Sequence, residues 1–508
     1  MSTVAQARVE TPFGSVAGSH LGGGIRRFLG IPYAQAPVGT MRLKSPGPLR
    51  AWSGTRDART PAPASLQTLG GNQVWMNEPI QNQSEDCLYL NIWTPDAGGK
   101  APVLFWLHGG QTRNGHGAAP GIDGAALARL GLVVVTISYR LGALGGLAHP
   151  DLRDQATGLC GNWGMQDKLA ALEWVGTCIE SFGGDPACVT LAGQSSGGAN
   201  AVMIAQHGLA TGRYARVIAQ SPPLFRPPMF VDLEAAAEYT EALAARMGVT
   251  VAGLREIDGV RIQREEHKFA SSPELAAGMG RPRTAPVRDG SLIKAWPYDA
   301  GPASVPVLTG WTREESNFWF DLRDGDGSVI SPLKPPRDDA ELEKRTGGLT
   351  RLHYAFPEAP LPRTVIDAYA ASGGPAEIWR DLYTDLVFRA PILHFAGQQV
   401  RAGAGAWVYE FAFPLPGSGG SPHASDVPFV FGTWGHPHLA CKIGSAPQVG
   451  AISAAMMGAW AGFARTGRCE WPPFDPSMPR VMRFGPDQAA GVPLERPAGL
   501  SRWPAYAA

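Results

Sequence analysis

Ser195 stands in the stretch LAGQSSGGAN (residues 191–200), where Gly193 and Gly197 complete a Gly-x-Ser-x-Gly pattern. Such a pattern presents a nucleophilic serine when it forms a sharp turn from a strand into a helix, because side chains at the two glycine positions would collide. The chain has 64 glycines, so a chance match is the competing interpretation. The strand-like CVTLAG before the serine and the small residues after it favour the nucleophile, at a helix N-terminus that stabilises negative charge.

A serine nucleophile needs a histidine as general base and an acid that orients the histidine. In hydrolases built on this turn, the acid and then the histidine follow the serine along the chain. The sequence must therefore supply elements that bring residues distant in the chain to one place.

These elements are predicted to be strands and helices in alternation. Apolar, β-branched runs that end in Gly- or Ser-rich turns predict strands at 102–110, 132–142, 188–194, 216–222 and 305–311. Near-continuous apolar runs suit strands that are buried on both faces of a parallel sheet. Between two of them, residues 162–184 carry apolar side chains at helical spacing and end in glycines. The alternation predicts an α/β fold with one doubly wound sheet.

Composition excludes several classes of protein. The formal net charge is zero, so no overall field attracts nucleic acid or an anionic membrane, and we expect neither as a partner. The N-terminal residues do not resemble a secretory signal, and no run of 18 apolar residues predicts a membrane span. Six cysteines without C-x-x-C spacing argue against a disulfide framework and against a zinc site. We expect a reduced, cytoplasmic protein.

The domain organisation is predicted to be simple. No linker or change of composition divides the chain, so residues 1–508 are expected to form a single domain. Residues of about 320–400 are less regular, with a charged loop and a Pro-rich stretch, and are expected to be helical insertions that form a lid. No Gly-x-Gly-x-x-Gly opens a helix after a strand, so a dinucleotide site is not predicted.

Longer motifs carry a resemblance to a known family. FGGDPACVTLAGQSSG (182–197) resembles the active-site signature of the type-B carboxylesterase and cholinesterase family of α/β-hydrolases, and EDCLYLNIWTP (85–95) resembles its second signature. Similar segments follow the family order over nearly the whole chain, at 28–43, 137–147, 161–175 and 460–467. The resemblance implies an α/β-hydrolase fold, with one large, mostly parallel sheet covered by helices and a lid over the active-site cleft. It also implies a serine hydrolase that cleaves carboxylic esters.

The resemblance implies which residues complete a catalytic triad. The family places its acid in a loop after a strand, and LTGWTREESNF puts this role on Glu315, with Glu314 as the neighbouring alternative. The histidine is expected in the loop before DVPFVFG, which is His423. His436 and His438 are the nearest rivals, but they follow that apolar segment instead of preceding it.

The expected chemistry then follows from these three residues. Neutral His423 takes the hydroxyl proton as Ser195 attacks the acyl carbon of a small-molecule ester, and donates it to the leaving alkoxide. Glu315 holds the imidazole in the required tautomer. Water opens the acyl-enzyme through the same steps, so neither a metal nor an organic cofactor is needed.

An oxyanion hole is expected from backbone N–H groups of Ser196 and of the turn WLHGGQTRNGHG (106–117). The family has His-Gly-Gly-Gly-Phe here, and this chain departs from it with Gln111 and Thr112 after two glycines. Gln111 keeps its N–H, so Gly110, Gln111 and Ser196 are expected to form a hole with three donors. A Cβ at Gln111 would be strained if the turn requires positive φ.

Other residues near the site are assigned less directly. The resemblance suggests that Ser221 hydrogen-bonds the acid, the alternative being a cap at a strand end. Gly109, Thr112 and Arg113 are expected to line the pocket, and Arg113 would favour anionic esters if its guanidinium faces the entrance instead of the solvent. Trp75 lies near the position of a substrate-binding tryptophan in cholinesterases, although its spacing fits poorly and a packing role is the alternative.

The resemblance also suggests two internal ion pairs, Arg42 with Glu85 and Arg140 with Asp167. Both would place charges in apolar surroundings, where charges need partners.

Two other functions compete with ester hydrolysis. A non-catalytic binding protein of the same fold is disfavoured because all three triad residues are present, while amide or carbamate hydrolysis, acyl transfer or elimination would use the same triad.

Overall fold

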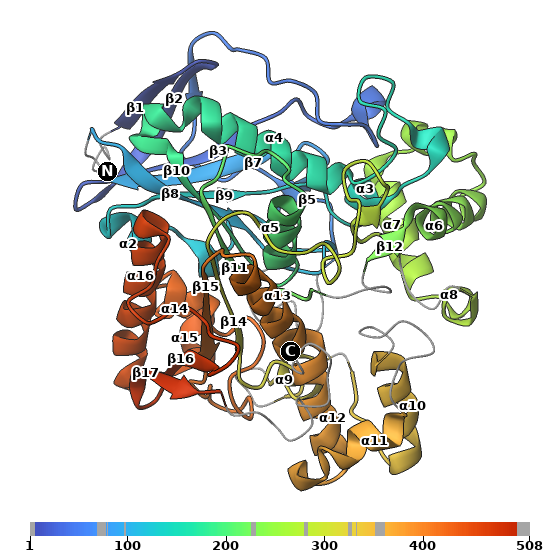
Figure 1. The fold of residues 1–508 in the computed structure, drawn as a ribbon. Coiled ribbons are helices and arrows are strands. Elements are labelled where there is room, and N and C mark those ends of the chain that lie inside the picture. The colour runs from blue at the N-terminus through green and yellow to red at the C-terminus, as the bar shows by residue number, and fades with distance from the viewer. Residues whose placement is uncertain are drawn as a thin grey trace.

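The protein folds around one large sheet (Figure 1). The structure is a computed structural model, and it describes residues 6–68, 78, 80–95, 98–224, 230–278, 283–323, 328–331, 333–350 and 361–494. Thirteen strands form the sheet. In spatial order they are β1 (Gln6–Thr11), β2 (Gly14–Gly22), β3 (Ile25–Pro32), β7 (Tyr89–Pro95), β9 (Val133–Ile137), β8 (Ala101–Leu107), β10 (Gly184–Gln194), β11 (Arg216–Gln220), β14 (Val307–Thr312), β15 (Ala406–Phe411), β16 (Arg480–Gly485) and β17 (Gln488–Pro493), with β4 (Thr55–Asp57) beside β2.

Strand direction divides the sheet into a parallel centre and antiparallel edges. From β9 through β8, β10, β11, β14 and β15 to β16, every neighbouring pair is parallel. At one edge β1, β2, β3, β7 and β9 pair antiparallel in that order, with β4 parallel to β2, and at the other edge β16 and β17 pair antiparallel. Two short pairs lie outside the sheet, β5 (Ala64–Ser65) with β6 (Gln83–Ser84) and β12 (Val231–Asp232) with β13 (Val287–Arg288). The large, mostly parallel sheet expected from the sequence is confirmed.

Helices cover both faces of this sheet. In the view of Figure 1, α4 (Trp163–Cys178) lies above the central strands and α2 (Ala125–Arg129) and α16 (Gln448–Thr466) lie below them. Side chains of β8 alternate accordingly, because Val103 and Phe105 join the core cluster of α4 and α5 (Ser196–Gln206), whereas Leu104 and Trp106 join that of α16. Burial on both faces explains why the central strands appear in the sequence as continuous apolar runs.

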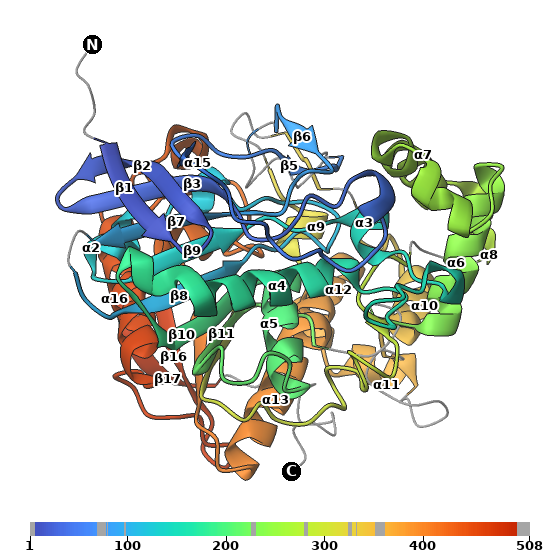
Figure 2. The same ribbon diagram turned by 90° about the horizontal axis from the view of Figure 1, so that it is seen from above.

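Two groups of helices stand outside these layers. The first, α6 (Leu233–Arg246), α7 (Gly259–Ala270) and α8 (Pro273–Gly278), gathers at one side of the sheet in both views (Figures 1 and 2). The second lies lower in Figure 1 and contains α10 (Asp339–Thr350), α11 (Pro362–Asp367) and α12 (Pro375–Thr384), followed by a π-helical turn (Asp385–Arg389) and α13 (Ala390–Arg401). Shorter helices are α3 (Gly142–Gly146), α9 (Asn317–Phe320), α14 (Val427–Val430) and α15 (Pro437–Ile443). None of the helices described is both long and apolar enough to cross a lipid bilayer.

Several expectations about single residues are confirmed. Both proposed ion pairs form with two hydrogen bonds between side chains each, at 2.5 and 2.7 Å between Arg42 and Glu85 and at 2.9 and 2.7 Å between Arg140 and Asp167. All six cysteines are free thiols. The five predicted strands are β8, β9, β10, β11 and β14, and the predicted helix is α4.

The carboxyl ends of the parallel strands determine where a site can form. Gly109 follows β8, Ser195 follows β10, Ser221 follows β11, and Glu315 follows β14 after a short turn. His423 lies in the longer loop after β15. In an open α/β sheet the carboxyl ends of parallel strands lie along one edge, where ligands bind. The topology therefore brings Gly109, Ser195, Ser221, Glu315 and His423, which are far apart in the chain, to one edge of the sheet.

Candidate active site

Ser195 occupies a strained turn between β10 and α5. Its backbone has φ 56° and ψ −129°, a conformation that side-chain-bearing residues rarely adopt. The two flanking glycines make the turn possible. A Cβ on Gly193 would lie 2.5 Å from the Gly197 backbone, and one on Gly197 would lie 2.1 Å from the Leu107 carbonyl oxygen. The glycines of the sequence pattern are therefore required by close backbone approach, as expected.

His423 and Glu315 form a buried pair beside this turn. The imidazole Nδ1 lies 2.5 Å from Glu315 Oε2, and the Glu315 side chain has no exposed surface. The other carboxylate oxygen, Oε1, accepts the Thr312 N–H at 2.8 Å. Glu314 points elsewhere and accepts the Ser421 N–H at 2.7 Å. Of the two adjacent glutamates, the structure brings Glu315 to the histidine.

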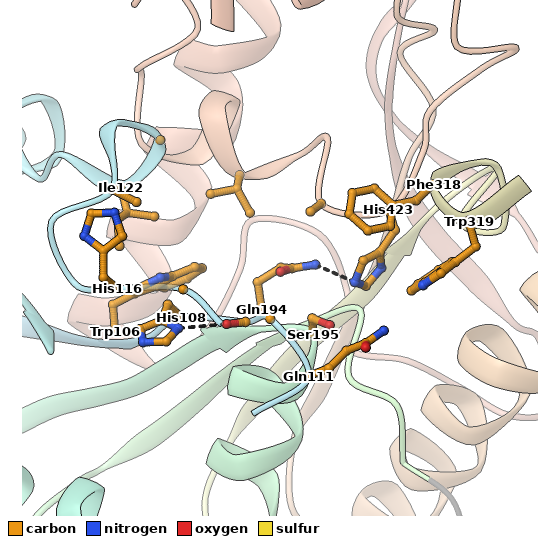
Figure 3. A pocket seen from close by; sticks show the side chains of 17 residues that line it. Trp106, His108, Gln111, His116, Ile122, Gln194, Ser195, Phe318, Trp319 and His423 are labelled. Atoms are coloured by element: carbon orange, nitrogen blue, oxygen red, sulfur yellow. Dashed lines mark hydrogen bonds between the residues drawn. The ribbon is translucent and has the colours of Figure 1, made fainter. Parts of the chain in front are cut away.

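The second nitrogen of His423 is bound by a residue that sequence reasoning missed. Nε2 of His423 lies 3.0 Å from Nε2 of Gln194, and this contact is the dashed line between them in Figure 3. Because Nδ1 faces a carboxylate and carries the proton, Nε2 is an acceptor and the Gln194 amide donates to it. In the described residues, no hydrogen bond joins Ser195 Oγ to His423. The only signal for Gln194 was its place directly before Ser195.

Aromatic rings surround the His423 imidazole. The ring centroids of Trp319 and Phe388 each lie 4.9 Å from that of His423, and Phe318 lies at 5.6 Å. Apolar rings keep water from the imidazole and fix its plane, so its hydrogen-bonding direction is set.

The rival histidines lie in another part of the molecule. His436 caps α15 by accepting the His438 N–H at 3.3 Å. His438 in turn contacts Lys442 through Nε2 at 3.2 Å. The structure thus brings His423, and neither rival, to Glu315.

The turn after β8 has the strain that the sequence suggested. Gly110 has φ 107°, and Gln111 and Thr112 follow with φ 57° and 58°. A Cβ on Gly109 would approach the Ser195 Cβ to 3.0 Å, so this turn packs directly on the nucleophile. Within the described chain, the N–H groups of Gly110 and Gln111 donate to no protein acceptor. Two donors therefore remain for a ligand beside Ser195.

Arg113 lines a cavity beside Ser195, as expected, but its guanidinium is already paired. Its guanidinium binds both carboxylate oxygens of Glu266, with Nη1–Oε1 at 2.7 Å and Nη2–Oε2 at 2.8 Å. Its side chain is 24% exposed, so it is not turned into solvent either. The preference for anionic esters was based on a guanidinium free to pair with a substrate. That basis is wrong, because the charge is already neutralised by a buried carboxylate.

Two further expectations have different outcomes. Ser221 is fully buried at φ 45°, and its Oγ has no hydrogen-bond partner in the described part of the chain. The expected bond to Glu315 is therefore not made; Oε1 of that carboxylate is occupied by the Thr312 N–H. Trp75 lies outside the described residues.

Two cavities meet at Ser195 and Gln111. The smaller one has a volume of about 80 Å³, and its wall contains Gln194 and His423. Figure 3 shows it between the Gln194–His423 contact and an aromatic wall with Trp106 and His116. The larger one has a volume of about 270 Å³. Its lining includes Thr112, Arg113, Ser196, Asn200, Phe230, Thr284, Trp319, Tyr383, Val387 and Phe388, but not His423.

Burial changes the titration of groups around the smaller cavity. It lowers the pKa of His108 to about 3 and that of His116 to about 4, so both imidazoles are neutral at pH 7. His108 also stacks on Tyr139, with ring centroids 4.3 Å apart. Burial raises the pKa of Asp426 to about 6, while Gln220 and Tyr409 donate to one of its oxygens. No group of three or more His, Cys, Asp or Glu side chains in the described residues is placed to hold a metal ion.

Comparison with known proteins identifies a family of similar chains and similar folds. A model of the carboxylesterase family matches residues 5–503. The fumonisin B1 esterase of Sphingopyxis macrogoltabida is 33% identical, over 95% of this chain and 87% of that protein. The para-nitrobenzyl esterase of Bacillus subtilis (strain 168) is 31% identical, over 92% of each chain. Among solved structures, a carboxylesterase of Geobacillus stearothermophilus superposes with a TM-score of 0.79 at 30% identity, over 98% of this chain and 99% of that one.

Proposed function

We propose that this chain, which belongs to the carboxylesterase family and is a carboxylic ester hydrolase, cleaves small-molecule esters with Ser195, His423 and Glu315 as its catalytic triad. The observation that carries the proposal is the buried contact of 2.5 Å between His423 Nδ1 and Glu315 Oε2. It supports an imidazole whose orientation is fixed beside the strained turn that presents the serine.

The proposed reaction begins when the Ser195 hydroxyl replaces the Gln194 amide as the donor to His423 Nε2. His423 then takes the hydroxyl proton as Oγ attacks the acyl carbon, and Glu315 stabilises the imidazolium that forms. The imidazolium gives this proton to the departing alkoxide, which leaves an acyl group on Ser195. Water, activated by the same histidine, releases the acid.

An oxyanion hole is proposed from the N–H groups of Gly110, Gln111 and Ser196. The N–H groups of Gly110 and Gln111 have no acceptor among the described residues, and Ser196 opens α5, where the first N–H groups lack partners within the helix. Each such donor lowers the barrier by roughly 3–4 kcal/mol when it is aimed at the developing negative oxygen.

The two cavities are proposed to hold the two halves of the ester. The leaving oxygen must lie near His423, which protonates it, and only the smaller cavity has His423 in its wall. We therefore assign the smaller cavity to the alcohol part and the larger one to the acyl part. The substrates favoured by this assignment have a small alcohol and a larger acyl group.

Residues of about 320–400 are proposed to act as a lid-like insertion within one domain that spans the chain. Support comes from Tyr383, Val387 and Phe388, which line the larger cavity from this segment. A cytoplasmic location stays a prediction, consistent with six unpaired cysteines.

The test of the nucleophile is the variant Ser195→Ala, assayed with p-nitrophenyl acetate. We expect the rate to fall by about four orders of magnitude or more, because the triad acts as a unit. An organophosphate should label Ser195 in the unchanged protein. Ser181→Ala, an exposed serine away from the site, serves as the control and should keep full activity. An active Ser195→Ala enzyme, or a label on another residue, would exclude the proposal.

The acid and the base are tested by matched pairs of variants. Glu315→Gln should lower kcat strongly, whereas Glu314→Gln should leave most of it, because only Glu315 contacts the imidazole. His423→Ala should be about as damaging as Ser195→Ala, and His436→Ala should be harmless. The reverse pattern in either pair would reassign that role.

A further inference from the structure

The turn after β8 contains two consecutive residues in the left-handed region that are not glycine. Gln111 and Thr112 have φ 57° and 58°. In this region the Cβ of an L-residue crowds the following carbonyl oxygen, so such residues occur mostly alone. Two in succession persist only when the surrounding structure holds them. Something beside the turn must therefore compensate for this strain.

Hydrogen bonds hold Thr112 through its N–H and its carbonyl, whereas Gln111 is held through its carbonyl, which accepts the Thr112 hydroxyl at 2.6 Å, and its N–H donates to no acceptor in the described residues. The Thr112 N–H donates to Ser196 Oγ at 3.3 Å, and its carbonyl accepts the Gly142 N–H at 2.8 Å. The Arg113 N–H donates to the Gly110 carbonyl oxygen at 3.0 Å, and this hydrogen bond closes the turn around Gln111 and Thr112. The Asn114 N–H donates to the same carbonyl oxygen at 3.1 Å, so the position of Arg113 and of the residue after it keeps the turn closed.

The Arg113 side chain is fixed by an ion pair that reaches a distant helix. Glu266 on α7 is completely buried, and its carboxylate accepts hydrogen bonds from both terminal nitrogens of Arg113. Tyr239 on α6 donates to the same carboxylate at 2.8 Å. Arg113 Nη1 also donates to Thr284 Oγ1 at 3.0 Å. A planar guanidinium in a two-point contact is held in position and in orientation.

We infer that the Arg113–Glu266 ion pair holds the turn at 110–112 in the conformation that aims its N–H groups at the acyl oxygen, so that Glu266 is a positioning residue for catalysis. The inference rests on the proposed hydrolysis at Ser195. Without the pair, Gln111 and Thr112 relax towards ordinary negative φ. The peptide planes then rotate, and the Gln111 N–H turns away from Ser195.

The inference explains how this chain accommodates Gln111 and Thr112 after the two glycines. With a third glycine the turn would adopt positive φ without strain and would need no clamp. With Gln111 and Thr112, the same geometry depends on a buried contact between the turn and the α6–α7 group. The strain and its support are therefore expected to depend on each other, which a double-mutant cycle can measure.

The experiment compares Glu266→Gln with the unchanged enzyme. Glutamine keeps the shape of the side chain but loses the charge that holds the guanidinium. We expect kcat to fall about tenfold to hundredfold with little change in KM, because the lost contact acts on the transition state. Binding of a trifluoromethyl ketone, whose adduct with Ser195 carries an oxyanion, should weaken by a similar factor. Active-site titration with an organophosphate normalises each rate to the folded enzyme.

The decisive comparison adds Gln111→Gly to the unchanged enzyme and to the Glu266→Gln variant. Glycine adopts positive φ without strain, so Gln111→Gly should restore most of the kcat lost in Glu266→Gln. A merely structural ion pair would give additive effects and no rescue. Glu173→Gln is the matched control, since it breaks the bidentate Arg213–Glu173 pair on α4, away from the turn and from α7, and its kcat per titrated site should not change.

Each outcome decides the inference. Unchanged kcat in Glu266→Gln, an effect confined to KM, or additive losses in the double variant would each overturn it. If Glu266→Gln does not fold, Arg113→Lys takes its place, because lysine keeps the charge but loses the two-point contact. Failure here is distinct from failure of the proposed function, because the titration still shows whether Ser195 is the nucleophile.

Discussion

Both ring nitrogens of His423 are bound before any substrate arrives. Glu315 binds Nδ1, and the Gln194 amide donates to Nε2 at 3.0 Å. An amide can serve either protonation state, since it offers N–H groups to a neutral imidazole and, turned over, its oxygen to an imidazolium. A carboxylate at the same position would favour the imidazolium alone. Gln194 therefore supports a histidine that changes its charge during each turnover.

The prediction at this scale is that Gln194→Glu moves the acid limb of the pH–rate profile to higher pH. A negative charge beside Nε2 holds the proton on His423, so activity at low pH should fall, with a shift of about one to three pH units. The profile of kcat/KM against pH measures this shift. Gln194→Met is the control, and it should change the rate without moving the limb. An unmoved limb in Gln194→Glu would mean that the amide has no influence on the titration.

The predicted strands located Ser195 after β10 and Glu315 after β14, but the resemblance to the family singled out Glu315 and His423 for the proposed triad. The strand before His423, β15, was not predicted, and the sheet brings the ends of these three strands to one edge. Partners of side chains were harder to predict. Arg113 was expected either to face the entrance or to turn into solvent, and its guanidinium instead binds Glu266, which lies more than 150 residues later. Such contacts depend on where α7 packs, and no local pattern records that position.

Among the elements, α4 contains a lysine in an unusual place. Lys168 is only 2% exposed, and its Nζ donates to the Gly164 carbonyl at 2.9 Å. The ammonium lies 3.4 Å from the centre of the Tyr139 ring. Burial lowers the pKa of Lys168 to about 7, although the neighbouring Asp167 opposes the shift. The side chain therefore loses much of its charge within the physiological range.

We predict that Lys168→Met stabilises the protein, and more so at pH 6 than at pH 10. Between about pH 7 and the ordinary lysine pKa of about 10.4, the unfolded chain binds more protons than the folded one, so the free energy of unfolding rises with pH. Below pH 7 the folded protein carries the full cost of a buried ammonium. The gain on substitution should be about 2–4 kcal/mol at pH 6 and small at pH 10.

Urea unfolding at the two pH values measures this difference. Lys344→Met is the control, because Lys344 is exposed on α10 and its replacement should have no pH-dependent effect on stability. A Lys168→Met variant that is destabilised equally at both values would show that the ammonium contributes favourably through Tyr139 and the Gly164 carbonyl.

At the level of elements, the sequence predicted the buried strands better than the helices outside the sheet. Continuous apolar runs identified β8 to β11 and β14, since those strands are covered on both faces. For residues of about 320–400 the sequence predicted helical insertions, but not the bounds of the individual helices. The helices there, α10 to α13, pack against one another and beside the site, and their register depends on long-range contacts that local periodicity does not encode.

For the whole molecule, the arrangement of two unequal cavities around Ser195 predicts substrate choice. Segments between residues 111 and 388 form the larger cavity, and only the smaller one contains His423. Between two esters of equal mass, the one with a long acyl chain and a methyl alcohol should give a higher kcat/KM than its acyl-alcohol inverse. Methyl hexanoate and hexyl formate are such a pair, compared by pH-stat titration. A preference for the formate would reverse the assignment of the two cavities.

The order of the strands has a consequence for how the enzyme reaches its active state. β9 lies between β7 and β8 although it follows β8 in the chain, and the site joins residues that are more than 300 positions apart. Contacts of such high sequence separation form slowly, because long loops must close, at a cost in chain entropy, before strand pairing stabilises the structure. Helices such as α4 and α16 can form earlier from local contacts. During renaturation, the circular dichroism signal of the helices should therefore recover while the enzyme is still inactive. The rate of ester hydrolysis should be the last property to return.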